Sequence, residues 1–248
     1  MAESNQKYLK KFKGNKPQKV NQNIEEKSHE FLRKLYPFIR DYDGQLPNIL
    51  DIFQPKAIEW LLSESVKSNN SVIKAKPLID FFINTGYKDE PEVDQDDKPF
   101  SRRTTPLHHA GKRDASIVPD LFKIYDRFDV NYTNEDGLTH FHVACNFDCV
   151  DVVEKFLELG QDPNCLVTKT GDSPLHLALD WYRHKKIAEL LLRAGADLNL
   201  ANVDGVTPLH KICLNHDELL EMFFNINEDK HQTVQIDAQD KDSKTPLH

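Results

Sequence analysis

The chain has 248 residues, of which 39% are hydrophobic and 29% are charged, so it can bury a core and is not disordered throughout. The formal net charge is −8, and the chain after Lys34 is acidic, which disfavours binding to nucleic acid. The longest stretch without Asp, Glu, Lys or Arg is Gly137 to Phe147. A membrane-spanning helix needs about twenty apolar residues, so we expect no membrane insertion.

Residues 1–24 are polar and lysine-rich, and they predict a basic disordered tail. The segment from Met1 to Lys34 carries nine Lys/Arg against four Asp/Glu. The lysines at 7, 10, 11, 13, 16 and 19 fit a nuclear-import signal, a tail that binds an acidic partner or a tail that only promotes solubility, and the sequence leaves these interpretations open.

Residues 25–98 predict a helical N-terminal cap or a degenerate repeat, followed by an acidic loop. Residues 28–36 have the pattern of a short helix stopped by Pro37. Pro55 to Val66 and Val72 to Thr85 read as two amphipathic helices, the second ending at Gly86. Asp89 to Asp97 holds six acids in nine residues but lacks the glycine of a calcium-binding loop, so we expect a solvated loop joining the cap to the array.

Residues 99–248 repeat one tetrapeptide five times. Its copies are Thr105-Pro106-Leu107-His108, Thr139-His140-Phe141-His142, Ser173-Pro174-Leu175-His176, Thr207-Pro208-Leu209-His210 and Thr245-Pro246-Leu247-His248. Successive copies start 34, 34, 34 and 38 residues apart, and an apolar residue follows two positions after each of the first four histidines. This period predicts an array of four stacked repeats plus the start of a fifth.

The residue types of the tetrapeptide explain the local structure. A Thr or Ser hydroxyl caps a helix start, and Pro at the first helical position loses no needed donor. The His can bond to the capping hydroxyl or to carbonyls of a neighbouring loop. Gly160 and Gly195 stand where a left-handed residue closes the second helix of a repeat. An Asp-Gly pair, as at residues 136–137 and 204–205, then turns the connecting hairpin.

The pattern resembles the ankyrin repeat, with its T-P-L-H-x-A signature, and the run Glu189 to Asn199 looks like the second helix of that family and its exit. The resemblance implies an all-α fold with short β-hairpin loops, a solenoid of stacked helix-turn-helix units. Arg127 stands where a glycine is expected, and four extra residues lie between Asn225 and Thr233. The second copy replaces Pro by His140 and Leu by Phe141.

No catalytic or cofactor site is visible in the sequence. Five of the eleven histidines belong to the tetrapeptide, and none of the nucleotide-binding, nucleophile or zinc-protease motifs is present. We also expect no zinc site at His140, His142 and Cys145. The four cysteines are too few for a disulfide framework, so they are interpreted as buried small hydrophobes in a reducing compartment, and we expect a cytoplasmic or nuclear location.

Partner binding is expected on the concave surface that the family forms from hairpin tips and first helices. The hairpin segments are 133–138, 166–170 and 201–206. The candidate contact residues are Trp181, Tyr182, Arg183, His109, Asn146, Phe147, Asp180, Lys211, Glu135, Lys169 and Val203. Trp181 and Tyr182 are hypothesised anchors, because Trp, Tyr and Arg are enriched in binding hot spots. The alternative is that Trp181 only seals the turn between two helices.

The sequence therefore predicts a non-enzymatic scaffold or adaptor, a monomeric array without cofactors that binds one or more proteins. The alternative is the interaction region of a larger polypeptide whose catalytic, ubiquitin-ligase or channel domain lies beyond residue 248. Because the fifth tetrapeptide has no second helix after it, the chain is expected to be a fragment.

Overall fold

The computed structural model describes residues 32–37, 39, 48–68, 74–111, 114–180, 185–215, 217–230 and 233–248. The chain divides into two compact units, each built from two stretches. The first unit contains Met1–Glu90 and Thr105–Arg127, and the second contains Pro91–Thr104 and Phe128–His248. The first hairpin therefore belongs to the second unit, while the helices that follow it belong to the first. The predicted tail, residues 1–24, lies outside the described residues.

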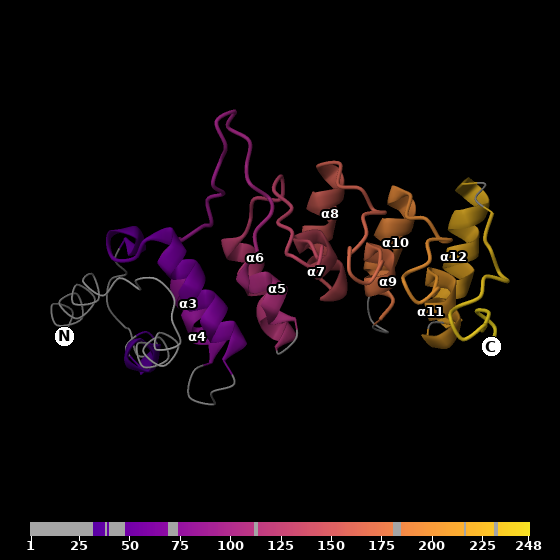
Figure 1. Cartoon of the computed structure of the whole chain (residues 1–248), viewed down its shortest axis with the longest axis horizontal. Helices are drawn as coiled ribbons and strands as arrows, with labels where there is room; N and C mark the ends of the chain where they lie inside the picture. The colour runs from indigo at the N-terminus through magenta and orange to yellow at the C-terminus, as the bar shows by residue number, and fades with distance from the viewer. Residues whose placement is uncertain are drawn as a thin grey trace. The chain divides into compact units, whose positions relative to one another are not determined.

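Two amphipathic helices precede the repeats, as their sequence pattern predicts. Helix α3 spans Pro55–Lys67 and helix α4 spans Ala75–Asn84 (Figure 1). Gly86, with φ of 73°, follows the second helix in the left-handed conformation. Both helices bury one apolar face, which in α4 contains Phe81 and Phe82, and they pack against each other. A short 3₁₀ turn, η1, spans Ile49–Asp51 before them.

One expectation for this unit is wrong. Residues 32–37 and 39 are helical, so Pro37 does not stop the helix that contains it. Proline lacks the N–H that would bond one turn back, but the φ that its ring imposes is compatible with a helix and its carbonyl still accepts. Leu35 and Ile39, which flank Pro37, are both buried.

The first repeat supplies the remaining helices of the first unit. Helix α5 spans Pro106–Ala110, the 3₁₀ turn η2 spans Ala115–Ile117, and helix α6 spans Val118–Ile124. Helix α3 packs on α5 and α4 packs on α6, so the two helix pairs stack in the same order. Without a glycine at Arg127, α6 is short and ends at Ile124, with Tyr125 as its C-cap.

The described part of the second unit contains a row of three helix pairs. Its first helices are α7 (His140–Asn146), α9 (Pro174–Ala178) and α11 (Pro208–Asn215). Its second helices are α8 (Val150–Glu158), α10 (Lys185–Ala194) and α12 (Asp217–Lys230). Each helix packs against the other helix of its own repeat and against the corresponding helix of a neighbouring repeat. Helix α12 is the longest of these six because it holds extra residues of the fourth repeat.

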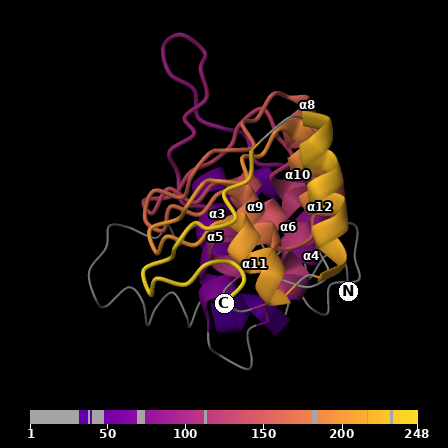
Figure 2. The same cartoon turned by 90° about the vertical axis from the view of Figure 1, so that its right-hand side faces the viewer.

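Hairpin loops connect successive repeats of this unit. Figure 2 shows the hairpins on one side, α9 and α11 beside them, and α8, α10 and α12 beyond. Gly160 and Gly195 have φ of 82° and 99°, the left-handed conformation expected of residues that end these helices. Gly137 has φ of 81°, and a Cβ there would lie 2.3 Å from Oγ1 of Thr168 in the next hairpin. The glycine therefore both forms its turn and lets the next hairpin approach closely.

The structure confirms the all-α fold class with short hairpins. Among the described residues, β-structure is limited to isolated bridges, of which Val93↔Pro99 and Thr133↔Thr139 are antiparallel.

His140 and Phe141, which replace Pro and Leu in the second tetrapeptide, are accommodated by aromatic contacts. The His140 ring lies edge-on to Tyr132, with centroids 5.1 Å apart, and the Phe141 ring lies edge-on to Phe156 at 5.6 Å.

Candidate functional site

The tetrapeptide histidines bridge successive repeats of the second unit. In His142 the Nδ1 atom accepts from the backbone N–H of Thr139 at 3.2 Å, and Nε2 lies 3.0 Å from the Cys165 carbonyl oxygen in the next hairpin. His176 and His210 repeat this arrangement on the carbonyls of Val206 and Lys244, at 2.9 and 3.1 Å. The Thr139 hydroxyl oxygen also lies 2.8 Å from Nδ1 of His142, so the predicted contacts of the histidine with the capping hydroxyl and with a loop carbonyl are both present.

The bonding pattern fixes the protonation state of these rings. A carbonyl can only accept, so Nε2 carries the proton, while Nδ1 accepts a backbone N–H and must be unprotonated. Burial lowers the pKa of His142 to about 4 and also lowers the pKa of His176. His142 and His176 are therefore neutral structural links near pH 7 and are not placed to act as acid–base catalysts.

A row of asparagines adds a second set of links that the sequence reasoning missed. The Asn164 side chain accepts from the N–H of Asp197 at 2.7 Å and donates to the Gly195 carbonyl at 3.0 Å. Asn199 makes the corresponding bonds to Gln235 and Thr233, both at 2.8 Å. The sequence signal was the recurring Asp-x-Asn after the second helix, at residues 129–131, 162–164 and 197–199.

The hairpin tips are also linked to each other. The N–H of Lys169 donates to the Asp136 carbonyl, and its ammonium lies 3.0 Å from the Asp136 carboxylate. Lys241 repeats both contacts on Asp204, with an ion pair of 2.7 Å. Between these two junctions Val203 donates its N–H to the Thr170 carbonyl, and its own side chain is apolar. These bonds therefore join the hairpin tips into a continuous ridge, in which Val203 provides an apolar side chain between the two ion pairs.

The structure places several predicted contact residues on this ridge. Glu135, Lys169 and Val203 lie on it; Lys169 is exposed, and Val203 retains 52% of its surface. Phe147, at the end of α7, is half-buried. Trp181, Tyr182 and Arg183 lie outside the described residues, so the anchor hypothesis for them stays a prediction. His109 is half-buried on α5, in the first unit.

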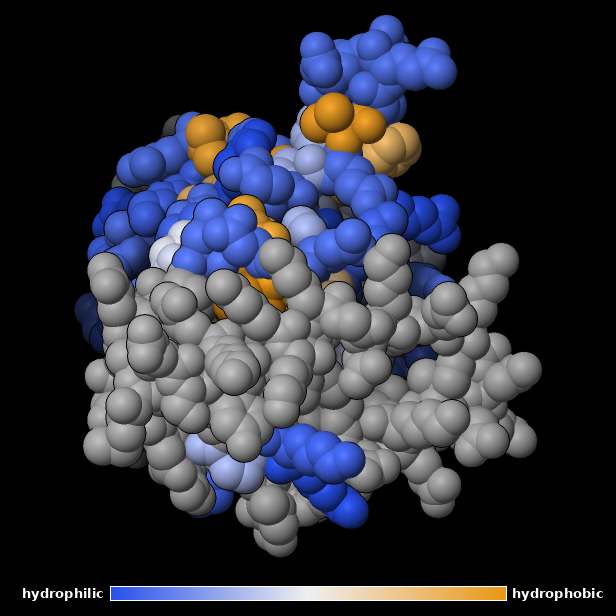
Figure 3. All heavy atoms as spheres, turned by 90° about the vertical axis from the view of Figure 1, so that its left-hand side faces the viewer, coloured by the Kyte–Doolittle hydropathy of each residue, from blue (hydrophilic) through white to orange (hydrophobic). Residues whose placement is uncertain are grey.

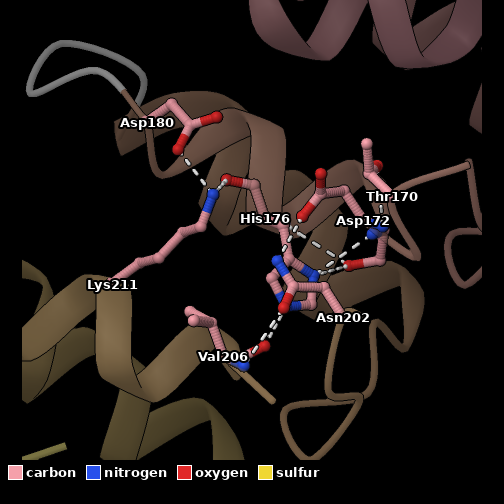
Figure 4. Close-up of polar contacts among 8 residues, drawn as sticks. Thr170, Asp172, His176, Asp180, Asn202, Val206 and Lys211 are labelled. Atoms are coloured by element: carbon pink, nitrogen blue, oxygen red, sulfur yellow. Dashed lines mark hydrogen bonds and ion pairs between the residues drawn. The ribbon is translucent and has the colours of Figure 1, made fainter. Parts of the chain in front are cut away.

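Lys211 differs from Lys169 because its side chain is only 16% exposed, against 68% for Lys169. Its ammonium donates to the His176 carbonyl at 3.1 Å and to the Asp180 carboxylate (Figure 4). The same junction contains the Nδ2 to Oδ1 bond between Asn202 and Asp172, 2.8 Å long. Lys211 therefore joins the third and fourth repeats, and Asp180 neutralises its charge.

The cysteines were expected to be buried, and Cys145 and Cys149 are, whereas Cys165 and Cys213 are only partly buried. Burial raises the pKa of Cys145, and it raises the pKa of Cys149 and Cys165 to about 12. All four cysteines are free thiols. Within the described part of the chain, no cluster of three or more His, Cys, Asp or Glu is arranged to hold a metal ion. None of the described helices is long and apolar enough to cross a membrane.

Comparison with known proteins identifies the repeats. A family model for ankyrin repeats matches residues 107–202 in three copies. The fem-1 homolog CG6966 of Drosophila melanogaster is 33% identical over 98 residues, which is 36% of this chain and 15% of that protein. The B-cell lymphoma 3 protein homolog of Mus musculus is 37% identical over 82 residues, 33% of this chain and 18% of the relative.

An ankyrin repeat protein of Rickettsia felis is 36% identical over 107 residues, covering 39% of this chain and 46% of the relative. The chain thus spans less than half the length of each of these relatives. Ankyrin repeats are generally protein-interaction modules. The matched repeats, together with the stacked helix pairs and linked hairpins, show that this chain contains ankyrin repeats.

Proposed function

We propose that the chain is a non-enzymatic scaffold or adaptor that binds a protein partner on the ridge of hairpin tips and the adjoining first helices. The observation that carries this proposal is the contrast between fixed backbone and exposed side chains on the ridge. Backbone bonds between tips hold Lys169, Val203 and Lys241 in place, while their side chains remain exposed. A preorganised surface binds with a smaller loss of conformational entropy.

Val203 is the first position to test on this ridge. It lies between the ion pairs Asp136–Lys169 and Asp204–Lys241, so an apolar contact there would be surrounded by polar groups. That arrangement, an apolar centre with a polar rim, is typical of protein interfaces. The buried His142 and His176 act as links between repeats, which also favours a binding role for the array.

The test is partner affinity after single changes on opposite faces of the second unit. Proteins captured on the immobilised chain are identified. The affinity of each for the parent chain and for the Val203→Asp variant is then measured by calorimetry. We expect Val203→Asp to weaken binding by roughly 2 kcal/mol or more, the effect of a hot-spot residue, with an unchanged melting temperature. Joint replacement of Trp181 and Tyr182 by alanine tests the anchor hypothesis in the same assay.

The matched control is Glu158→Lys, on the exposed side of α8. Lys155 is a poorer control, because its ammonium lies 5.1 Å from the centre of the Phe128 ring and its removal would disturb packing. If Glu158→Lys weakens binding and Val203→Asp does not, the partner uses the outer helices and the ridge proposal is wrong.

A further inference from the structure

The ridge of the second unit joins four hairpin tips, which we call the first to the fourth tip in chain order. They are residues 135–136, 168–170, 203–204 and 241–242. A backbone N–H of each later tip donates to a carbonyl of the tip before it, at 3.0, 2.9 and 2.9 Å; the donors are Lys169, Val203 and Lys241. The order and spacing of the tips are therefore fixed by direct contacts between them.

The charges of the tips alternate along the ridge. The first and third tips carry the acids Asp136 and Asp204, and the second and fourth tips carry Lys169 and Lys241. Each lysine pairs with the acid of the preceding tip, at 3.0 and 2.7 Å, yet all four side chains remain between 46% and 68% exposed. A series of negative, positive, negative and positive tips has the opposite sign at every tip when it is read backwards.

Each of these charged groups has room for a second partner. A lysine ammonium has three donors, and a carboxylate accepts at two oxygens. The ion pairs of the ridge use Oδ1 of Asp136 and Oδ1 of Asp204, with one contact from each lysine. A second charged group can therefore bind either member of a pair without breaking the pair.

The hairpin of residues 92–100 precedes the first tip but does not extend this series. It projects as a separate arm (Figures 1 and 2), and its end is hydrophilic, with hydrophobic surface below (Figure 3). Near its base, Thr133 of the next hairpin donates to the Ser101 carbonyl at 2.8 Å and accepts from Arg103 at 3.0 Å. The alternating series therefore begins at the first tip.

We propose that the ridge binds a second copy of this chain, ridge against ridge and in antiparallel order. The first tip then faces the fourth tip of the second copy, which brings Asp136 to Lys241 of the second copy. The second tip faces the third, which brings Lys169 to Asp204 of the second copy. Because these residues are already paired within each chain, the contacts close into a ring of four alternating charges. The two-fold axis repeats the ring, so all four tips of each copy take part.

The order of the tips favours a second copy over another occupant. An interface between identical copies related by a two-fold axis needs a surface that is its own complement, and the alternating series meets this condition. Parallel ridges in register would set like charges opposite each other. Val203 lies on the third tip, next to the axis, and faces the second tip, where the methyl groups of Thr168 and Thr170 offer an apolar contact. Glu135, exposed on the first tip, faces Lys241 of the second copy.

Self-association would cover the surface that the proposed function assigns to a protein partner and would compete with that partner. The proposal rests on the proposed function in this one respect. Exposed ion pairs are individually weak and are screened by salt. We therefore expect a dissociation constant of about 0.1–1 mM at low ionic strength, which leaves the dilute chain monomeric.

The test is sedimentation equilibrium of the full chain at concentrations up to about 1 mM. An acidic-ridge variant, Lys169→Asp with Lys241→Asp, and a basic-ridge variant, Asp136→Lys with Asp204→Lys, each place one sign on all four tips. We expect neither to associate on its own, whereas an equimolar mixture of the two should associate at least as tightly as the parent. A variant with all four changes keeps the alternation and the net charge, and its dissociation constant should stay within about threefold of the parent value.

Asp96→Lys, on the projecting arm, is the matched control for a change of charge outside the ridge. It should alter the dissociation constant less than about twofold. Melting temperatures show whether each variant is folded, and they should stay near that of the parent because the changed ion pairs are exposed.

Three results would overturn the proposal: a parent chain that stays monomeric at the highest concentration, a mixture that does not associate, or a basic-ridge variant that associates more tightly than the parent. The last result would show that general repulsion governs association, because this variant has a net charge closer to zero.

The proposed function is tested separately, at micromolar concentrations where the dimer is dissociated. Partner binding that depends on Val203 in a chain that never self-associates would preserve the proposed function and overturn the dimer. Self-association with the expected charge dependence, in a chain whose partners ignore Val203, would preserve the dimer and overturn the proposed function.

Discussion

The third tetrapeptide and the fifth share the hydrogen bonds between the N-cap residue and the histidine, but they differ in their surroundings. In both copies the N-cap N–H donates to the histidine Nδ1, at 3.1 Å in Ser173–His176 and 3.0 Å in Thr245–His248. Leu175 is completely buried, whereas Leu247 retains 83% of its surface. The motif therefore forms the bonds between cap and histidine locally, while its contribution to stability depends on the repeats that pack against it.

The largest expected difference is between the two leucines. Leu175→Ala should destabilise the chain by about 2–5 kcal/mol, because it removes a fully buried side chain and leaves a cavity. Leu247→Ala should change the free energy of unfolding by less than about 0.5 kcal/mol, because its side chain is already in water. Urea titration of both variants measures the difference, and equal losses would contradict the dependence on neighbouring repeats.

The buried histidines should make the central repeats sensitive to acid. The pKa of His142 falls from 6.5 to about 4 on folding, mainly because of burial, so the folded state binds fewer protons. The contribution of His142 to the free energy of unfolding is fully present above pH 6.5 and is lost as the pH falls toward 4. The total loss is on the order of 3 kcal/mol. Denaturant midpoints from pH 7.5 to 4.5 measure this loss.

His142→Gln provides the control for the pH series. The variant should be less stable than the parent at pH 7.5, and its stability should fall less steeply below pH 6.5. A parallel decline in both proteins would assign the acid sensitivity to other groups, such as the paired carboxylates.

Substitution of the hairpin glycines should cost less stability, and this cost too should depend on what the next repeat packs against them. Gly137→Ala should cost roughly 2–3 kcal/mol, because its positive φ is unfavourable for alanine and the new Cβ would overlap Thr168. The last hairpin already has a serine, Ser243, at this position with φ of 60°, and it is exposed. Ser243→Gly should therefore stabilise slightly, by at most about 1 kcal/mol. Thermal melting of both variants distinguishes overlap from backbone strain; similar small shifts would show that the two hairpins do not pack closely.

The smallest effect is expected for the lysines. The Lys211 side chain is 16% exposed, so Lys211→Met, which removes its bonds to the His176 carbonyl and Asp180, should cost about 1–2 kcal/mol. Lys244 pairs with Asp242 at 3.5 Å in the last hairpin and is 61% exposed, so Lys244→Met should cost less than about 0.5 kcal/mol. Repeating the urea titrations in concentrated salt adds a check, since screening should reduce only the second value appreciably.

The elements that depend on a few adjacent residues were predictable from the sequence. Thr139 and Ser173 begin helices because their hydroxyls and the following residues satisfy the helix start locally. Gly160 and Gly195 take positive φ because glycine has no Cβ to clash. The same reasoning failed at Pro37, where the rest of the helix outweighs one lost hydrogen bond.

The candidate site depended on contacts between residues more than thirty positions apart, which only the stacked repeats bring together. Lys211 was expected on the binding surface, but the tertiary structure gives its ammonium two partners in the preceding repeat. The acidic segment was expected to be a solvated loop, but Asp89 is buried, and Asp94 to Asp97 form a hairpin turn that matches those of the repeats. Whether a charge on such a turn is paired depends on the residue that the next repeat places beside it, as Lys169 lies beside Asp136.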